Sequence, residues 1–576
     1  MIAESARPRR FAKPALLALY GILFLPEFFD RLRDIGGIAG PLAYTVLVLA
    51  ALCGIIGAAY TANALLRGGL ALLLFAASFV IEAYARSSLE FLTYGAFIDL
   101  ITAAEFAGDA MDQNEAALWR SLPGPAVLLI AVAWPPRRRA RTRANTPALA
   151  MPAALVLCTL LAFTRGGDGL KALPGGYAAL SYAVLAAYER AAGDLGPRKG
   201  VSIAHVRAPL YRDIVLIVDE SISGHYLDIN HPRGVRSGLA EARPGVEIAN
   251  FGVAASATNC SAGSNLVLRF AGTRDSYRRD IAVGPSLWDY AAHAGLETVY
   301  IDAQRSGGAM QNQMTPRERE RIDRFIQFGG LAVRDRDMAV ADRLAQLLGD
   351  GTASFILVNK VGAHFPIHDK FPDSHARYRP ILPRGGFLDV TDTGSRTGFG
   401  GSQADWRRYR NSYRNTLEWS VGAFFDRLLE RAELADALVI YTADHGQNLH
   451  EGGKGGTTTH CSVDPRPEEG AVPLVVLQGG AGALAFTPGG AASHYMIAPT
   501  LLAAMGYDRE AVRARSGGAL DEPSRDPATF NYLYNARLNR EPRWREVDPA
   551  ALAPVPTTRR RAGHSDRRRL SCRAAP

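Results

Sequence analysis

The chain has 576 residues, more than one hydrophobic core usually serves, so at least two structural units are expected. Hydrophobic residues make up 48% of it, but they are concentrated in residues 1–165, and the remainder has ordinary globular composition. The five scattered cysteines and the modest net charge of +9, much of it in two arginine clusters, argue against a disulfide framework and against a nucleic-acid-binding protein.

Apolar segments typical of membrane-spanning helices fill the first 165 residues. They cover residues 14–29, 41–66, 68–85, 117–135 and 147–164. A helix needs roughly 17 residues or more to cross a bilayer, and the first and fourth segments are near or below that length. The simplest prediction is a five-helix transmembrane domain over residues 1–165.

Charges in the loops predict the orientation of these helices. Arg67 and the arginines of 137–143 lie in loops on the same side as the basic N-terminus, whereas the loop 89–115 is acidic. Since cytoplasmic loops carry the excess of Lys and Arg, the N-terminus is expected in the cytoplasm and the chain after Arg165 outside it. Glu82, inside the third segment, is either a functional carboxylate or close enough to the interface to reach water.

The pattern changes after the apolar part. Residues 166–206 form a Gly/Ala-rich connector with one amphipathic helix expected at 177–192, which would lie on the membrane surface. From residue 207 strands alternate with helices, which predicts an α/β domain over 207–540 with a doubly wound, mostly parallel sheet. The expected strands are 213–218, 298–302, 355–359, 438–441 and 472–477, with helices at 336–348 and 413–432. Residues 541–576 are Pro- and Arg-rich and are expected to be disordered.

Metal-binding side chains follow three of the expected strands. Glu220 comes just after the first strand, His364 a few residues after the third, and Asp444 with His445 directly after the fourth. His460 follows a Gly/Thr-rich loop that could fold it back over the same point. Open α/β sheets assemble their sites at the carboxyl ends of the strands, so these side chains predict a zinc-like site of oxygen and nitrogen ligands.

The loop 258–264, Thr-Asn-Cys-Ser-Ala-Gly-Ser, is the candidate source of a nucleophile. It precedes an apolar helical stretch at 266–270. A nucleophile at a helix N-terminus beside a dication is deprotonated more easily, because both stabilise the anion.

Several motifs occur in a characteristic order: Glu220 at a strand end, the loop 258–264, Gly-x-His-x-Pro at 362–366, Asn-x-Tyr-x-Asn-Thr at 411–416, Asp-His-Gly at 444–446, Val-Pro at 472–473 and Ser-His at 493–494. In this order they resemble the membrane phosphoethanolamine transferases that modify lipid A, members of the alkaline phosphatase and sulfatase superfamily. The resemblance implies a multi-pass protein of the bacterial inner membrane. Its plan is a five-helix bundle followed by a periplasmic sulfatase-like domain.

The resemblance also implies roles for the residues of the site. Glu220, Asp444 and His445 match zinc ligands, the nucleophile would be the fourth ligand, and His364 and His460 would hold the transferred phosphate or a second zinc ion. One or two Zn²⁺ ions are the implied cofactor. Phosphatidylethanolamine is the implied donor and lipid A or another glycan the implied acceptor, with no nucleic acid involved and a monomer expected.

The identity of the nucleophile stays open at this point. The transferases use a Thr, and ungapped counting from Glu220 places Cys260 there, as both nucleophile and metal ligand. Cys260 also begins a stretch resembling the sulfatase motif Cys-x-Pro-x-Arg, although Ser264 stands where the Arg belongs. With a shift of one residue, Ser261 becomes the nucleophile in a segment resembling the Ser-Ala-Ala-Ser of alkaline phosphatases. A third possibility is that Cys260 is a buried structural residue; a Cys461 to Cys572 bridge is also possible.

The expected reaction is a two-step transfer through a covalent phospho-enzyme, with His364 or His460 protonating the leaving oxygen. Three alternatives remain: a sulfatase or phosphodiesterase-type hydrolase, a phosphoglycerol transferase, and an inactive lipid-sensing homologue.

Overall fold

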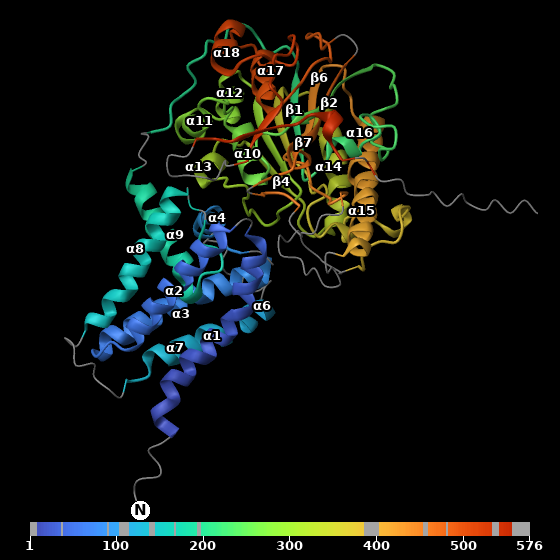
Figure 1. The fold of residues 1–576 in the computed structure, drawn as a ribbon. Helices are drawn as coiled ribbons and strands as arrows, with labels where there is room; N and C mark the ends of the chain where they lie inside the picture. The colour runs from blue at the N-terminus through green and yellow to red at the C-terminus, as the bar shows by residue number, and fades with distance from the viewer. Residues whose placement is uncertain are drawn as a thin grey trace, which may run out of the picture.

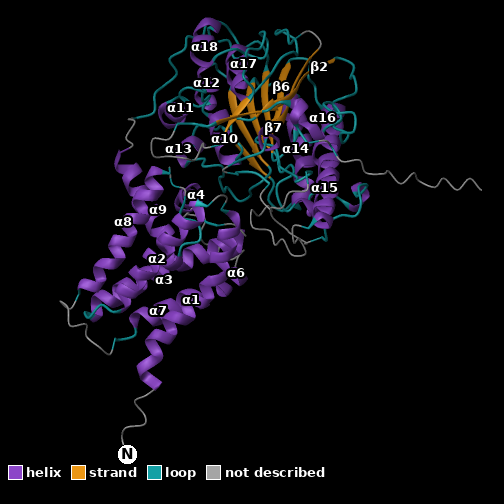
Figure 2. Cartoon of the chain, in the orientation of Figure 1, coloured by secondary structure: helices purple, strands orange, loops and turns teal. Residues whose placement is uncertain are grey.

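The computed structural model describes residues 8–35, 38–88, 91–102, 115–136, 145–165, 167, 169–192, 197–384, 402–452, 459–462, 464–479, 482–532, 541–553 and 555. A bundle of helices forms the N-terminal part, and a sheet flanked by helices forms the rest (Figures 1 and 2). The two parts have separate hydrophobic cores: the described core residues of the bundle run from Tyr20 to Leu185, and those of the sheet domain from Ile203 to Val555.

The predicted apolar segments are mainly helical, and the segment 117–135 forms two short helices. The helices are α1 (Pro8–Asp34), α2 (Ala39–Ala59), α3 (Ala64–Ser88), α4 (Tyr94–Thr102), α6 (Glu115–Ser121), α7 (Pro123–Ala133) and α8 (Ala150–Thr164). Within the described residues, four stretches are long and apolar enough to cross a membrane, namely Phe11–Arg33, Ala39–Ala59, Ala64–Arg86 and Thr146–Thr164. The predicted fourth span corresponds to the shorter apolar stretch Ala117–Ala133, in which Pro123 separates α6 from α7.

Helix α9 (Tyr177–Ala192) covers the range predicted for an amphipathic helix. It packs against α3, α4 and α8, and its Tyr177 and Tyr182 side chains are fully buried. The Tyr94 hydroxyl of α4 donates a hydrogen bond of 2.9 Å to Glu189 Oε2 of α9. The apolar face of α9 therefore completes the bundle, and its placement at a membrane surface stays a prediction.

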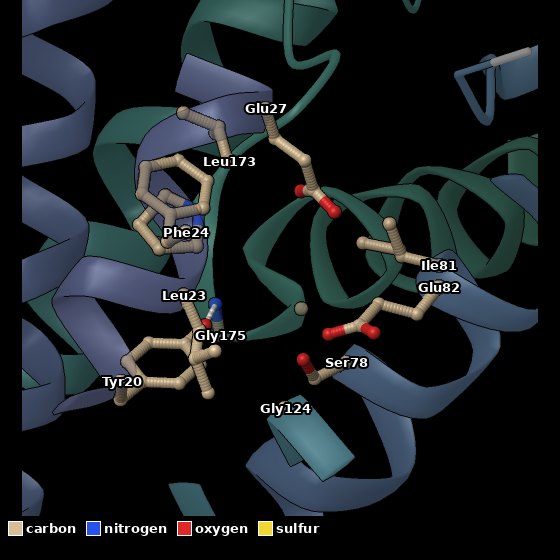
Figure 3. A pocket seen from close by; sticks show the side chains of 12 residues that line it. Tyr20, Leu23, Phe24, Glu27, Ser78, Ile81, Glu82, Gly124, Leu173 and Gly175 are labelled. Carbon is tan, nitrogen blue, oxygen red and sulfur yellow. Dashed lines mark hydrogen bonds between the residues drawn. The ribbon is translucent and has the colours of Figure 1, made fainter. Parts of the chain in front are cut away.

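Glu82 lines a cavity between α1, α3 and the turn at 173–176 (Figure 3). Its carboxylate and that of Glu27 point toward the same space, together with the Ser78 hydroxyl. The Arg86 guanidinium lies 3.8 Å from Glu82 Oε2, one helical turn along α3. The Glu82 carboxylate therefore faces the interior of the bundle and has a basic neighbour.

The second part is built on a seven-stranded sheet of order β2-β7-β6-β1-β5-β3-β4. Its strands are β1 (Asp213–Asp219), β2 (Val246–Ala255), β3 (Glu297–Asp302), β4 (Arg324–Gln327), β5 (Ser354–Asn359), β6 (Ala437–Ala443) and β7 (Ala471–Gly479). The five strands from β6 to β4 pair in parallel, whereas β7 is antiparallel to both β6 and β2. Every residue of β1, β5, β6 and β7 is buried, as expected for strands covered on both faces. The predicted doubly wound, mostly parallel fold is confirmed.

Helices stand on both sides of this sheet (Figure 2). They are α10 (Ser261–Arg269), α11 (Tyr277–Val283), α12 (Leu287–His293), α13 (Pro316–Arg319), α14 (Val333–Leu348), α15 (Gln403–Leu417), α16 (Phe424–Arg431), α17 (Ile497–Ala504) and α18 (Arg509–Ser516). The predicted helix at 413–432 is in fact the end of α15, a π-helical turn at Glu418–Ala423, and α16.

The folded domain extends beyond residue 540, where the sequence predicts a disordered tail. Strand β9 (Trp544–Glu546) pairs antiparallel with β8 (Thr529–Asn531), and Val547 and Val555 are buried. The predicted disorder is therefore wrong for residues 541–553, because β9 pairs with β8 and the Val547 side chain is buried. The arginines of 559–573 lie outside the described residues.

Candidate active site

Two neighbouring parallel strands bring three potential ligands together. Strands β1 and β6 pair in register, with Asp219 opposite Ala443, so the next residues Glu220 and Asp444 leave the sheet side by side. The ligand atoms of Glu220, Asp444 and His445 all lie within 4.8 Å of one another, and the three side chains are buried. The sheet edge named from the sequence is thus where these groups meet.

The donor atoms in this group fit a divalent ion such as zinc. Asp444 Oδ1 accepts hydrogen bonds from the backbone N–H of Ser221 and of His445, at 2.9 and 2.7 Å. Its buried Oδ2 accepts none from any residue that the structure describes. His445 Nδ1 donates to the Gly446 carbonyl at 2.7 Å, which directs Nε2 toward Glu220 Oε1 at 3.5 Å and Asp444 Oδ2 at 3.8 Å. A backbone-held imidazole and two carboxylates are a donor set that suits zinc.

Burial and mutual repulsion set the charges in this group. Burial raises the pKa of Asp444 to about 7, and the adjacent Glu220 carboxylate adds to the shift. Burial alone would lower the pKa of His445, but the Asp444 and Glu220 carboxylates raise it to about 9. Burial acts against ionisation of Glu220 too, yet its hydrogen bond with His445 and the nearby His364 hold its pKa below the ordinary value. The group therefore retains protons that a divalent cation would displace.

Ser261 is the residue of the loop 258–264 that faces this group. It is the first residue of α10, and its Oγ lies 3.1 Å from His445 Nε2 and 3.2 Å from Glu220 Oε1. A hydroxyl at this point is close to two proposed ligands and to the positive end of the helix dipole. The helix dipole favours its ionised form, as would a cation held by these residues, whereas the Glu220 carboxylate alone opposes it.

Cys260 does not face the group. Its sulfur is bonded to that of Cys461, so the predictions that it is the nucleophile and a metal ligand are wrong: it offers no thiolate. The suggested Cys461 to Cys572 bridge is wrong for the same reason.

Hydrogen bonds hold the loop 258–264 in place. Thr258 N–H donates to Ser264 Oγ at 3.0 Å, so the residue that replaces the Arg of the sulfatase motif closes the loop on itself. Ala257 N–H donates to His494 Nδ1 at 3.0 Å, and His494 Nε2 lies 3.0 Å from Thr442 Oγ1 at the end of β6. Burial lowers the pKa of His494 to about 3, so this histidine is a neutral bridge between loop and sheet.

The two further histidines of the prediction also lie at the site. The His460 ring stacks on that of His445, with 4.4 Å between ring centroids and 20° between planes. His364 is close enough for its charge to lower the pKa of Glu220, and its Nδ1 donates to the Phe365 carbonyl at 2.6 Å. Both residues are half-buried.

One contact of the ligands has no counterpart in the sequence prediction. Gln304 Nε2 donates to Glu220 Oε2 at 3.3 Å and to the Lys360 carbonyl at 2.7 Å. Its backbone N–H donates in turn to Asp302 Oδ1 at 3.0 Å. The segment 302–304 stands out in the sequence as an acidic strand end followed by an amide. Nothing in the sequence shows that the amide turns toward β1.

A buried ion network lies beneath the ligands. Lys360 is fully buried; its Nζ donates to Asp219 Oδ2 at 2.6 Å and lies 3.9 Å from Asp337 Oδ2. Asp219 directly precedes Glu220, and the Asp337 carboxylate accepts the backbone N–H groups of 361–362 at 2.8 and 3.1 Å. The network thus joins the chain that carries Glu220 to the chain that leads to His364.

Known proteins are similar to this chain in sequence. The Sulfatase family model matches residues 212–507, more than half of the chain. A stretch of 147 residues, 24% of this chain, is 29% identical to Kdo(2)-lipid A phosphoethanolamine 7''-transferase of Escherichia coli (strain K12). That stretch spans 22% of the relative's own length.

Two solved structures match this chain, and the first of them is similar to it in fold. The integral membrane protein lipooligosaccharide phosphoethanolamine transferase A (EptA) from Neisseria meningitidis is 18% identical; the match covers 85% of this chain and 96% of that one, with a TM-score of 0.60. The C-terminal periplasmic domain of EptC from Escherichia coli, in complex with Zn, is 16% identical, covering 58% and 93%, with a TM-score of 0.46. The family match, the sheet order and the Glu-Asp-His group at the strand ends together show that the chain belongs to the sulfatase family.

Proposed function

We propose that this protein is a membrane-bound, zinc-dependent transferase that moves phosphoethanolamine from a phospholipid to lipid A or another periplasmic glycan or lipid. The observation that carries the proposal is the position of Ser261 Oγ, 3.1 Å from His445 Nε2 and 3.2 Å from Glu220 Oε1, beside the unpartnered Oδ2 of Asp444. Two similar proteins, a Kdo(2)-lipid A phosphoethanolamine 7''-transferase and a lipooligosaccharide phosphoethanolamine transferase, support phosphoethanolamine as the transferred group and a lipid A-type acceptor.

The chain's own residues supply the two steps of the transfer. Glu220, Asp444 and His445 would hold the ion, which when bound lowers the pKa of a neighbouring hydroxyl and neutralises phosphate charge. Ser261 Oγ gives its proton to His364 or His460 and attacks the phosphorus of the donor; the serine–phosphorus bond forms, and the bond from phosphorus to the diacylglycerol oxygen breaks. His364 or His460 gives that oxygen a proton. An acceptor hydroxyl then attacks the same phosphorus, and Ser261 regains its proton from the histidine that took the acceptor's.

The apolar helices account for access to a lipid donor. Four stretches of the described chain are long and apolar enough to cross a membrane, and a shorter apolar stretch lies at Ala117–Ala133. With the N-terminus in the cytoplasm, as the arginine-rich loops predict, a helix bundle of this kind would hold the sheet domain on the periplasmic face of the inner membrane. A domain tethered there meets its lipid substrate at high local concentration.

Replacing Ser261 tests the assignment. The purified full-length Ser261→Ala variant is expected to lose phosphoethanolamine transfer by on the order of 1000-fold or more, because it removes the hydroxyl that lies 3.1 Å from His445 Nε2. Ser286→Ala is the matched control: it removes another serine at a helix start, that of α12, whose hydroxyl donates to Asp289 and not to a proposed ligand, and should retain turnover. Full activity of Ser261→Ala would refute the assignment.

The mass of the group on the product separates the related reactions. Lipid A mass spectrometry, with and without expression in a bacterial host, is expected to show added phosphoethanolamine. Phosphoglycerol on a glycan would instead show the alternative transferase, and release of free phosphoethanolamine without a modified acceptor would show a hydrolase.

A further inference from the structure

The disulfide between Cys260 and Cys461 joins the two residues next to the reacting groups. Cys260 directly precedes Ser261, and Cys461 directly follows His460, although 201 residues of sequence separate them. The bridge therefore connects the N-terminus of α10 to the segment that carries the stacked histidine.

Hydrogen bonds reinforce this connection. Cys461 N–H donates to the Asn259 carbonyl at 2.8 Å, and Asn259 Nδ2 donates to the Ser462 carbonyl at 3.1 Å. Glu469 Oε2 accepts from both Asn259 Nδ2 and Ser462 N–H, at 2.9 and 3.1 Å. The residues on either side of the bridge are thus held on a common buried carboxylate.

The backbone at Cys461 is in a conformation that a non-glycine residue rarely adopts. Its φ is 57°, in the left-handed region, so the chain turns sharply immediately after His460. Such a conformation persists when surrounding contacts over-determine it. The bridge to Cys260 and the hydrogen bond to Asn259 are those contacts here.

We propose that Cys260 and Cys461 are positioning residues: their disulfide holds the His460 ring against His445 and at a fixed place relative to Ser261. The inference rests on the proposed function, in which His364 or His460 gives or takes the proton of the phosphoryl-transfer steps, and it assigns that role to His460. Without the bridge, the His460 ring could still transfer a proton, but it would no longer be held against the His445 ring. A misplacement of about 1 Å at a reacting group can reduce turnover on the order of 100-fold.

A double-mutant cycle separates positioning from general stabilisation. Four full-length proteins are compared with phosphatidylethanolamine in mixed micelles: wild type, Cys260→Ser/Cys461→Ser, His460→Ala, and the triple variant. Loss of the bridge is expected to lower kcat by roughly 10- to 100-fold with KM little changed, and the triple variant should match His460→Ala alone. If the two losses multiply in the triple variant, the bridge does not act through His460 and the proposal is overturned.

The other two cysteines provide the matched control. Cys53 of α2 and Cys158 of α8 form no disulfide within the described residues, and they lie in the bundle. The Cys53→Ala/Cys158→Ala variant should retain wild-type kcat.

If the bridge variant fails to fold, the same comparison is made on folded wild type and folded His460→Ala protein. Tris(2-carboxyethyl)phosphine gives two electrons to the bridge, which becomes two thiols while the phosphine becomes its oxide; oxidised glutathione then restores the bridge and the activity.

Hydrogen–deuterium exchange gives a readout that is independent of the reaction. With zinc content matched by elemental analysis, opening the bridge should speed exchange at 459–462 and at 257–261, and leave distant strands such as β3 unchanged. Unchanged exchange at 459–462 overturns the positioning role even if wild type transfers phosphoethanolamine. Faster exchange there, in a protein that transfers nothing to any acceptor, would instead mean that the proposed function has failed while the bridge still places His460.

Discussion

Two adjacent side chains, Cys260 and Ser261, leave the chain in different directions, and this decides which of them can react. Cys260 has extended backbone angles, φ −140° and ψ 143°, and Ser261 begins α10. The sulfur consequently points to Cys461, while the hydroxyl points to Glu220 and His445. Counting along the sequence cannot resolve a difference of one residue, because the choice depends on where the helix begins.

Among the proposed metal ligands, Glu220 accepts a hydrogen bond on its Oε2 atom from the Gln304 side chain, with Nε2 at 3.3 Å. Gln304→Ala is expected to lower zinc affinity by roughly 10- to 100-fold, because partners that orient a ligand contribute about that much. Competition with a chromogenic chelator measures it. Gln311→Ala is the control, since Gln311 Nε2 donates to Asp302 Oδ1 at 3.2 Å and touches no proposed ligand. Equal affinities in the two variants would contradict the role of Gln304.

The ends of β1, β5 and β6 are where separate segments become one site. Hydrogen-bonded register fixes how the strands end, and Lys360, the residue after β5, ties β1 to α14 through Asp219 and Asp337. Lys360 also lies 4.1 Å from the centroid of the Phe424 ring. A lysine with no exposed surface is retained here by the two carboxylates that neutralise it.

Removing this lysine should unfold the domain more easily. Lys360→Met is expected to lower the free energy of unfolding by about 3–5 kcal/mol, because it leaves buried carboxylates without their cation. Denaturant unfolding followed by tryptophan fluorescence measures the loss. Arg427→Met breaks the partly exposed pair with Asp342, 2.6 Å long, and should cost at most about 1 kcal/mol. Comparable losses in the two variants would show that the buried network contributes no more than a surface pair.

The elements could be predicted to different degrees for physical reasons. Buried strands such as β1 and β6, and the apolar helices, are continuous apolar runs, and the sequence locates them and the proposed ligands at the strand ends. Strand β9 is short and half-exposed, so it has no such pattern. The pairing of Cys260 with Cys461 and the contact of Gln304 with Glu220 join segments far apart in sequence, and only the folded sheet brings them together.

On the scale of the whole molecule, the helix bundle and the sheet domain pack around separate hydrophobic cores. The core of the bundle and the core of the sheet domain share no described residue, and the Glu220, Asp444 and His445 group lies wholly in the second. The bundle would therefore act on access to the lipid donor and not on the chemistry. Its exposed apolar residues on α1, α2, α3 and α8 are consistent with lipid contact.

Separating the parts tests this division. The fragment of residues 197–576 is expected to fold alone and to hold as much zinc per chain as the full-length protein, because its core is complete. Its transfer from phosphatidylethanolamine in vesicles should fall at least about tenfold, since the donor is no longer at high local concentration. Circular dichroism, elemental analysis and a vesicle assay give the three readouts. An equal vesicle rate would contradict the access role of the bundle.

In the proposed reaction, Ser261 carries the phosphoethanolamine group between donor and acceptor. The most direct test incubates the full-length protein with phosphatidylethanolamine in the absence of an acceptor, quenches it in acid and maps the adduct by peptide mass spectrometry. Phosphoethanolamine is expected on Ser261, is expected to be absent from the Ser261→Ala variant, and should disappear from Ser261 when lipid A is added. An adduct on a different residue, or transfer that proceeds in Ser261→Ala, would contradict it.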